Sequence, residues 1–304
     1  MQVSDIWNSV SKLTDTQNDL VSKFIFKKAD ALVEAVLYKY PTFQERTVIC
    51  CSTQCGCPIG CTFCGSGNFF ARSLKASEIV TQVMACLNAT GVDPSTIQNL
   101  QIMFMSMGEP MLNYDNLELA LIELHSLYPN AKLLVSTSAP PKPCSGFGRL
   151  IRLAKQITQI GLQFSVHEST DEARAKLIRT RTRPLESISR LGAWWVLETG
   201  RPAFFNYCVH EGNNSPEDVE RLKTLFNPSI WEATLSVICQ KDETVSSSID
   251  RQEKLAKDFA GLMAEAGFST RVFNPAGQDS IGGGCGQLWR VQEWARENNK
   301  LRKA

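Results

Sequence analysis

Long apolar runs are missing from this sequence. Hydrophobic residues make up 43% of its 304 positions. They occur in short runs, and no stretch approaches the ~20 apolar residues that a membrane-spanning helix requires. The N-terminus, Met-Gln-Val-Ser-Asp-Ile-Trp, also lacks the basic and then apolar order of a signal peptide. We therefore expect no membrane association and no export.

The sequence also lacks any strong bias of charge or composition. Its formal net charge of +1 argues neither for nor against a nucleic-acid partner. No internal repeat, low-complexity segment or Pro/Gly/Ser-rich linker interrupts the chain. A chain of 304 residues can bury a large core, so we expect one large α/β domain, alone or with an appendage.

Cysteine, in contrast, is plentiful. The eleven cysteines lie mostly in or beside apolar segments, which is unlike a secreted disulfide framework and fits a reducing cytoplasm. Three of them, Cys57, Cys61 and Cys64, form a C-x3-C-x2-C pattern on a glycine-rich loop. Thiolates so close together suit zinc, Cu(I) or an iron–sulfur centre.

The missing second pair of ligands narrows this choice. Structural zinc normally takes four protein ligands, and no second C-x2-C or H-x3-H follows the loop. Three cysteines would leave the fourth iron of a cubane cluster without a protein ligand, so that a substrate or cofactor can bind there. We therefore predict a catalytic [4Fe–4S] site. A loop of uncoordinated or zinc-bound cysteines is the alternative.

From residue 46 onward, short apolar strands alternate with longer amphipathic helices. Such strand-then-helix units predict a parallel sheet with right-handed crossovers, because parallel neighbours need a connection of helix length. We predict an α/β fold, a partial (βα)6 barrel over residues 46–304. The expected strands are 47–51, 101–105, 132–136, 162–166, 203–209 and 233–238, and the expected helices lie near 76–88, 115–127, 147–159, 186–198, 215–226 and 250–266.

Residues 1–45 are expected to form a small N-terminal α/β appendage. Residues 4–13 are interpreted as a short helix. Residues 23–27 and 33–38 are interpreted as two strands, joined by a polar turn at 28–30.

Polar motifs follow several of the expected strands, at the edge where parallel sheets bind ligands. In Met-Ser-Met-Gly-Glu-Pro, residues 105–110, Gly108 permits close backbone approach and Glu109 can accept hydrogen bonds from an ammonium group. Taken alone, this motif is more typical of an ordinary strand-to-helix turn than of a ligand site. Small hydroxyls and a lone histidine at strand ends often only satisfy the backbone. These weaker candidates are Ser136, Ser165, Val166 and His167.

Near the C-terminus, Cys285 lies in Ile281-Gly-Gly-Gly-Cys-Gly-Gln-Leu, just before a helix expected from about residue 287 to 299. A helix N-terminus favours the thiolate, which is the nucleophilic form of cysteine. The neighbouring glycines argue against burial in a packed core. We therefore favour a reactive Cys285 over a buried spacer cysteine.

With Phe63 directly before Cys64, the cysteine loop resembles the C-x3-C-x-[aromatic]-C signature of radical S-adenosylmethionine (SAM) enzymes. The motifs together, in this order, resemble the RNA adenosine methyltransferases of that superfamily. These enzymes methylate adenosine C2 in large-subunit ribosomal RNA and in tRNA, and their antibiotic-resistance relatives methylate C8. The likeness runs from Val33-Glu-Ala-Val to Cys285-Gly-Gln-Leu, nearly the whole chain. The latter element is the most discriminating, because most radical SAM enzymes lack such a cysteine.

The resemblance implies cofactors and the residues that bind them. The three loop cysteines would bind the [4Fe–4S] cluster. SAM, two molecules in each turnover, would be held by Gly108, Glu109, Ser136, Ser165, Val166 and His167. An electron donor such as flavodoxin and a thiol reductant would support turnover.

The resemblance also implies a division of labour between two cysteines. Cys285 would take a methyl group from one SAM, and the radical from a second SAM would abstract hydrogen from that methyl. The resulting methylene radical would add to an sp2 carbon of the acceptor. Cys50 would remove a proton from the adduct and close a transient disulfide with Cys285, and Glu34 matches an acidic residue proposed as a proton acceptor.

The chain departs from the family pattern in three places. On this comparison it begins too late to include the family's N-terminal RNA-contacting domain. The family's SAM-contacting asparagine is absent near Gln240-Lys241. The family's Ser-Leu-His-Ala-Pro becomes Ser-Val-His-Glu-Ser from Ser165 onward.

One segment supports an RNA substrate. Residues 174–183 carry five basic residues and no acidic one, enough for several salt-dependent phosphate contacts, although a solvated helix end is an equal alternative. The predicted function is radical SAM methylation of an sp2 carbon, with adenosine C2 of ribosomal RNA or tRNA as the favoured acceptor. Adenosine C8, a non-RNA small molecule and a peptide stay open as acceptors. A non-catalytic iron–sulfur module is disfavoured by the presence of Cys50 and Cys285.

Overall fold

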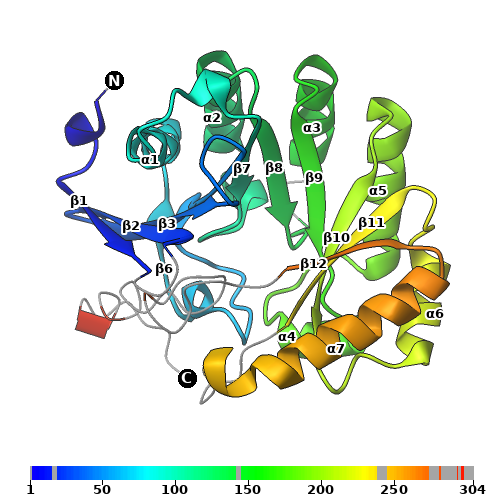
Figure 1. Ribbon diagram of the computed structural model, residues 1–304. Helices are drawn as coiled ribbons and strands as arrows, with labels where there is room; N and C mark the ends of the chain where they lie inside the picture. Colours follow the sequence, from blue (N-terminus) through cyan, green and yellow to red (C-terminus); the bar gives the residue numbers. More distant parts are fainter. Residues whose placement is uncertain are drawn as a thin grey trace. The chain divides into compact units, whose positions relative to one another are not determined.

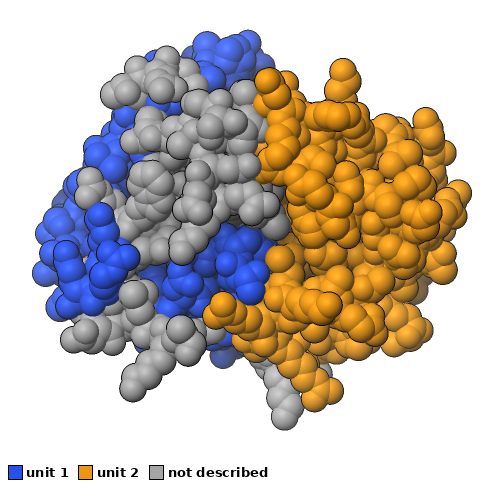
Figure 2. Space-filling model, turned by 90° about the horizontal axis from the view of Figure 1, so that it is seen from below, with its two compact units in different colours: residues 1–136, 142–161, 275–304 blue, residues 137–141, 162–274 orange. Residues whose placement is uncertain are grey.

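Strands and helices alternate along most of the chain (Figure 1). The structure, a computed structural model, describes residues 2–15, 19–141, 145–237, 245–273, 281, 293 and 296–297. The chain divides into two units, shown in different colours in Figure 2. Unit 1 comprises residues 1–136, 142–161 and 275–304, and unit 2 comprises residues 137–141 and 162–274.

Unit 1 is built on a sheet with the strand order β1-β2-β3-β4-β7-β8. Its first four strands pair antiparallel, whereas β4, β7 and β8 pair parallel. A small antiparallel ribbon, β5 with β6, follows β4. The strands are β1 (Ser9–Thr14), β2 (Val21–Lys28), β3 (Ala31–Lys39), β4 (Arg46–Cys51), β5 (Gln54–Gly56), β6 (Phe70–Ser73), β7 (Asn99–Phe104) and β8 (Lys132–Thr137).

Each parallel strand of unit 1 leads into a helix. Helices α1 (Ala76–Asn88), α2 (Tyr114–Leu127) and α3 (Ser145–Gln156) follow β4, β7 and β8 in the chain. Helices α1 and α2 contact each other side by side (Figure 1). Short 3-10 helices complete the connections: η1 (Val3–Asp5), η2 (Gly65–Asn68), η3 (Pro94–Thr96) and η4 (Pro110–Asn113).

Unit 2 repeats the same alternation in a parallel sheet of order β9-β10-β11-β12. Buried aromatic rings fill its core: Phe226 packs edge-on against Trp231 at 4.9 Å between ring centroids. Its elements are β9 (Ile160–Ser165), α4 (Asp171–Leu177), α5 (Leu185–Thr199), β10 (Ala203–Val209), α6 (Pro216–Leu225), β11 (Trp231–Val237), α7 (Val245–Glu265) and β12 (Ser269–Val272). No helix in the described part of the chain is both long and apolar enough to span a bilayer.

The predicted α/β fold with six strand-then-helix units is confirmed. All six expected strands and all six expected helices are present, with ends shifted by a few residues. The sequence did not reveal the β5–β6 ribbon, helix α4 or strand β12, which are each at most seven residues long. The boundary between residues 45 and 46 stays a prediction, and β3 pairs with β4 across it.

The helix predicted over residues 4–13 is wrong. Only the 3-10 turn η1 forms there, and residues 9–14 form β1, whose register places Ser9 opposite Lys27. The exposed backbone edge of β2 offers hydrogen bonds that outweigh a weak local helix preference. The appendage is therefore a β-sheet rather than α/β, and the two strands predicted over 23–27 and 33–38 are confirmed as β2 and β3.

Candidate active site

The three motif cysteines lie on one loop between β5 and β6. The backbone N–H of Cys57 donates to the carbonyls of Ser66 and Phe69, both at 2.8 Å, which closes the loop on itself. A side chain at Gly67 would place its Cβ 2.8 Å from the carbonyl oxygen of Cys61, so the turn requires glycine. Of the eight cysteines in the described residues, only these three are partly exposed, and the others are buried.

The donor chemistry of this loop fits a cluster better than a single ion. One metal ion at ~2.3 Å from each sulfur would draw three thiolates within ~4 Å of one another. Among the described residues, no group of three His, Cys, Asp or Glu side chains is arranged in that way. A cubane cluster gives each cysteine its own iron and so accepts wider spacing.

The surroundings of Cys57 disfavour its thiolate form. Burial, and after it the neighbouring Cys64, raises the pKa of Cys57 to about 12. A coordinated iron would overcome this penalty, since metal-bound thiols are deprotonated. Three soft donors on one loop therefore suit the [4Fe–4S] group that the motif implies.

Gly108 and Glu109 contact the strand that leads into the cysteine loop. Gly108 has a φ of +93°, and a Cβ there would lie 2.5 Å from the Cβ of Gln54 on β5. The N–H of Glu109 donates to the Gln54 side-chain oxygen at 2.9 Å. The close approach predicted at Gly108 is thus an approach to Gln54. The Met-Gly-Glu-Pro motif and the cysteine loop are joined inside unit 1.

Glu109 is a buried carboxylate with one oxygen engaged by the fold. Its Oε1 accepts a hydrogen bond from the N–H of Met111 at 3.0 Å and so caps η4. Its charge also contributes to raising the pKa of Cys57, which places the carboxylate near the cysteine loop. Ser136, another predicted SAM contact in unit 1, is buried in β8.

In unit 2, the predicted SAM contacts Ser165, Val166 and His167 follow one another at the end of β9. His167 adopts a left-handed backbone with a φ of 63°. Its N–H donates to the Asn206 carbonyl at 3.1 Å, and its own carbonyl accepts from the Asn213 side chain at 2.9 Å. Burial, with the charge of Arg174, lowers the pKa of His167 to about 3, so its imidazole is neutral near pH 7.

The Arg174 side chain connects several backbone carbonyls at this strand end, a role that the sequence did not predict. Its guanidinium donates to the carbonyls of Ser138 and Ser165 at 2.9 Å and of Val166 at 3.0 Å. Its side chain is fully buried. The interpretation of residues 174–183 as one basic RNA-binding segment is therefore wrong at Arg174, because a buried guanidinium cannot meet a phosphate.

The other basic side chains of residues 174–183 differ in their exposure and contacts. Arg183 donates from its side chain to the Pro141 carbonyl at 3.3 Å and from its backbone to Ala139 at 2.9 Å. Lys176, Arg179 and Arg181 are exposed. These three are the side chains of the segment that remain available to a polyanion.

Glu168 and Ser169, two of the residues that differ from the family pattern, take part in a polar network. Glu168 Oε1 lies 2.8 Å from His210 Nε2, and this carboxylate raises the pKa of His210. Ser169 donates to Asp218, the helix-capping acid at the start of α6. The network joins the residues after β9 to those after β10.

Glu34, the predicted proton acceptor, is buried in β3 and paired with Lys23 of β2. Lys23 Nζ lies 2.7 Å from Glu34 Oε2. The backbone carbonyl of Glu34 accepts hydrogen bonds from the hydroxyls of Ser52 at 2.6 Å and Ser106 at 2.9 Å. Lys23 was not singled out from the sequence, because a lysine in a hairpin normally points to solvent.

Cys50, the residue before the last of β4, lies in an apolar cluster. It packs with Val36, and Met103, Met105 and Ile281 pack against the same cluster. Its predicted disulfide partner Cys285 lies outside the described residues, as do Gln240 and Lys241. Ile281 is the described residue nearest to Cys285 in the chain.

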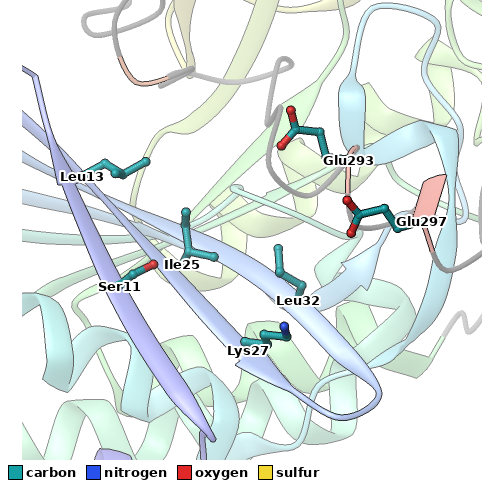
Figure 3. A pocket seen from close by; sticks show the side chains of 7 residues that line it. All are labelled: Ser11, Leu13, Ile25, Lys27, Leu32, Glu293 and Glu297. Atoms are coloured by element: carbon teal, nitrogen blue, oxygen red, sulfur yellow. The ribbon is translucent and has the colours of Figure 1, made fainter.

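A pocket of about 380 Å³ opens on the strands of the N-terminal sheet (Figure 3). Leu13, Ile25 and Leu32 give it an apolar floor, and Glu293 and Glu297 lie opposite them. Ser11 and Lys27 complete its lining. None of the predicted site residues that the structure describes is among these lining residues.

Comparison with known proteins gives consistent relatives, although no protein-family model matches the chain. Over 276 residues it is 33% identical to the ribosomal RNA large subunit methyltransferase N of Nitrosopumilus maritimus, covering 88% of this chain and 76% of that protein. Over 296 residues it is 30% identical to the probable dual-specificity RNA methyltransferase RlmN of Clostridium tetani, with 94% and 78% covered.

A solved structure supports the same fold. The crystal structure of a radical SAM methyltransferase from Sphaerobacter thermophilus matches with a TM-score of 0.75 and 28% identity, covering 91% of this chain and 79% of that chain. The predicted radical SAM fold class is therefore confirmed.

Proposed function

This chain belongs to the RlmN family of dual-specificity RNA methyltransferases, and we propose that it methylates C2 of an adenosine in ribosomal RNA or tRNA by radical SAM chemistry. The family resemblance predicted from the motifs is confirmed by these relatives. The acceptor base and its carbon are part of the proposal. A base in folded RNA must leave its stack to reach a buried site, as in other base-modifying enzymes.

The observation that carries the proposal is the place of Cys50. Cys50 shares its apolar cluster with Ile281, which lies four residues before Cys285 in the chain. We therefore assign Cys285 as the methyl carrier, and Cys50 as the base and thiol that releases the methylated product from it. This release would form a transient Cys50–Cys285 disulfide, which a thiol reductant would reopen.

The cofactors follow from the loop and the strand ends. Cys57, Cys61 and Cys64 would hold the [4Fe–4S] cluster, which, when bound, supplies the electron that cleaves SAM. Glu109 would accept the SAM ammonium group, because a buried carboxylate near the cysteine loop is suited to a cationic partner. The other assigned SAM contacts are Gly108, Ser136, Ser165, Val166 and His167.

Turnover sets further requirements. We propose two SAM molecules in each cycle, because one methylates Cys285 and the other removes hydrogen from that methyl group. An electron donor such as flavodoxin would reduce the cluster. These needs favour a reducing compartment such as the cytoplasm.

The proposal is tested by following the methyl group. The reconstituted protein is incubated without oxygen, with a reductant and methyl-deuterated SAM, in the presence of RNA and a metabolite extract. We expect labelled 2-methyladenosine after nuclease digestion of the RNA, and no product with the Cys57→Ala variant. Label in 8-methyladenosine would reassign the carbon, and label confined to the small-molecule fraction would contradict an RNA acceptor.

A further inference from the structure

Two opposite charges are buried together in the N-terminal sheet. The side chains of Lys23 and Glu34 are 1% and 0% exposed, and their charged atoms are 2.7 Å apart. Removing two charges from water costs about as much as their attraction returns, so apolar residues of similar volume would often be as stabilising. Fold stability alone does not explain why both charges are kept here.

Strand register places this pair on the same face as Cys50. Lys23 lies opposite Val36, and Val36 lies opposite Cys50 on the next strand. Directly opposite residues of neighbouring strands project to the same face, and so do residues two apart on one strand. Lys23, Glu34 and Cys50 therefore share one face of β2, β3 and β4.

The pair is also linked to both motif loops of unit 1. The Glu34 carbonyl accepts a hydroxyl hydrogen bond from Ser52, at the start of the segment that leads to the cysteine loop. It accepts a second from Ser106, within the Met-Ser-Met-Gly-Glu-Pro motif. A shift of Glu34 would disturb these contacts at once.

We propose that Lys23 is a positioning residue of the methyl-transfer site, which holds Glu34 as an ionised carboxylate beside Cys50. This proposal deepens the proposed function and rests on it. Burial at 0% exposure disfavours the charged form of the Glu34 carboxylate and so favours uptake of a proton. The ammonium of Lys23 prevents this and fixes the direction of the carboxylate, so Glu34 stays able to accept a proton during turnover.

The other charged groups on this face are few. In the described part of the chain, the strands place Lys27 of β2 and Arg46 of β4 on this face, together with the titratable groups of Tyr38 and Cys50. The carboxylates Glu293 and Glu297 line the pocket that Lys27 and Ile25 also line. Lys27 is exposed and lies on the same strand as Lys23, which makes it a matched control.

The test compares Lys23→Met, Lys23→Arg, Glu34→Gln and the double variant Lys23→Met/Glu34→Gln with Lys27→Met as control. For Lys23→Met we expect the cluster content and SAM cleavage of the wild type, but at least tenfold slower RNA methylation at pH 7. Its rate should recover as the pH rises, because a higher pH favours the ionised form of Glu34. Lys23→Arg should restore most of the rate, and Lys27→Met should match the wild type at every pH.

The double variant separates function from folding. Two neutral side chains leave no unpaired charge, so its melting temperature should return close to that of the wild type. Its methylation should nevertheless stay low at every pH. Wild-type methylation by the double variant, or a pH profile of Lys23→Met parallel to that of the wild type, would overturn the proposal.

A second readout does not depend on RNA. Infrared difference spectra should show a protonated carboxyl band at pH 7 in Lys23→Met that is absent from the wild type and from the double variant. Absence of this band in Lys23→Met would refute the role of Lys23. If the wild type cleaves SAM but methylates no RNA, the proposed function fails, whereas the infrared result still decides whether Lys23 keeps Glu34 ionised.

Discussion

Gln54 and Glu109 join the two motif loops of unit 1: the Gln54 side-chain oxygen accepts the N–H of Glu109 at 2.9 Å. Gly108 lies next to this contact. Because it has no side chain, the Cβ of Gln54 can come close to its backbone. Gln54 precedes Cys57 by three residues. The residue assigned to SAM is therefore hydrogen-bonded to the strand that leads into the loop assigned to the cluster.

The cluster assignment predicts different outcomes for neighbouring cysteines. Replacing Cys57, Cys61 or Cys64 by Ala should remove the brown absorbance of the reconstituted protein and its production of 5′-deoxyadenosine, because each thiolate is an iron ligand. Cys55→Ala is the control, since the Cys55 thiol is buried and donates to the Leu32 carbonyl at 3.4 Å. Full iron content in any of the three motif variants would refute the assignment.

Glu109 predicts a loss of SAM affinity without loss of the cluster. Glu109→Gln keeps an oxygen that can accept from Met111 and cap η4, but it removes the charge that pairs with the SAM ammonium. A charge-assisted hydrogen bond contributes about 1.5–3 kcal/mol, so the Kd for SAM should rise roughly 10- to 150-fold. Equilibrium binding to the anaerobic holoprotein measures this. An unchanged Kd would leave Glu109 as a capping residue only.

The sequence predicted the parts of the fold that depend on periodicity. Helix α1 was expected over 76–88 and is present over Ala76–Asn88, because its apolar spacing and its burial agree. Strand β1 was missed, since its mostly exposed residues form a strand only by pairing with β2. Periodicity describes one element at a time and cannot report such a partner.

The same limit applies to the candidate site. The cysteine motif, Gly108 and Glu109 are local in sequence and could be recognised there. The buried charges of Lys23 and Arg174 could not, because their partners are set by strand pairing and by the ends of other strands. A long basic side chain is exposed in most contexts, and only the folded carbonyl groups around Arg174 reverse that expectation.

The basic segment over residues 174–183 yields a revised prediction. The triple variant Lys176→Gln/Arg179→Gln/Arg181→Gln removes the exposed charges and leaves Arg174 and Arg183 in their structural hydrogen bonds. If these side chains contact phosphates, RNA affinity should fall and its dependence on log salt should flatten by about 0.7–0.9 for each lost contact. Binding titrations at several salt concentrations measure the slope.

The control for this experiment removes the same kind of charge elsewhere in unit 2. Arg190 and Lys254 are exposed and pair with Glu186 and Asp258 on their own helices. Replacing both by Gln should leave the salt slope unchanged. An equal loss of slope in the control and in the triple variant would mean that the effect is general charge and not this segment.

Because His167 is buried in its neutral form, we expect the free energy of unfolding to decrease in acid. The unfolded residue takes up a proton near its ordinary pKa of 6.5, whereas burial and Arg174 hold the folded pKa at about 3. Stability from the neutral imidazole is complete above pH 6.5 and falls as the pH drops toward 3. The free energy of unfolding should therefore decrease by about 2 kcal/mol between pH 7 and pH 5 through this residue.

His167→Asn isolates this effect. Asparagine tolerates the left-handed backbone at this position and does not titrate. The wild type should lose about 2 kcal/mol more than His167→Asn between pH 7 and pH 5, as measured by urea unfolding. His210, whose pKa Glu168 raises, acts in the opposite direction, but it is present in both proteins and cancels. Equal pH dependence in the two proteins would contradict a buried neutral His167.

The last prediction separates the two cysteines of the methyl-transfer reaction. Cys285→Ala removes the carrier, so no methyl group from SAM should appear on the protein and no RNA should be methylated. Cys50→Ala keeps the carrier but removes the thiol that releases the product. Because the Cys50 site is an apolar cluster with Val36, Met103 and Ile281, alanine should be tolerated there with only a modest loss of stability.

Cys50→Ala should therefore accumulate joined to its acceptor through a methylene bridge at Cys285. Mass spectrometry of the purified variant would show the added mass, and nuclease digestion would reduce it to one nucleotide if the acceptor is RNA. A small increment that nuclease does not change would instead identify a small molecule or a peptide. The double variant Cys50→Ala/Cys285→Ala should carry no adduct at all, because the bridge requires the carrier sulfur. An adduct in that protein, or a methyl group on Cys285→Ala, would place the methyl carrier on a different residue.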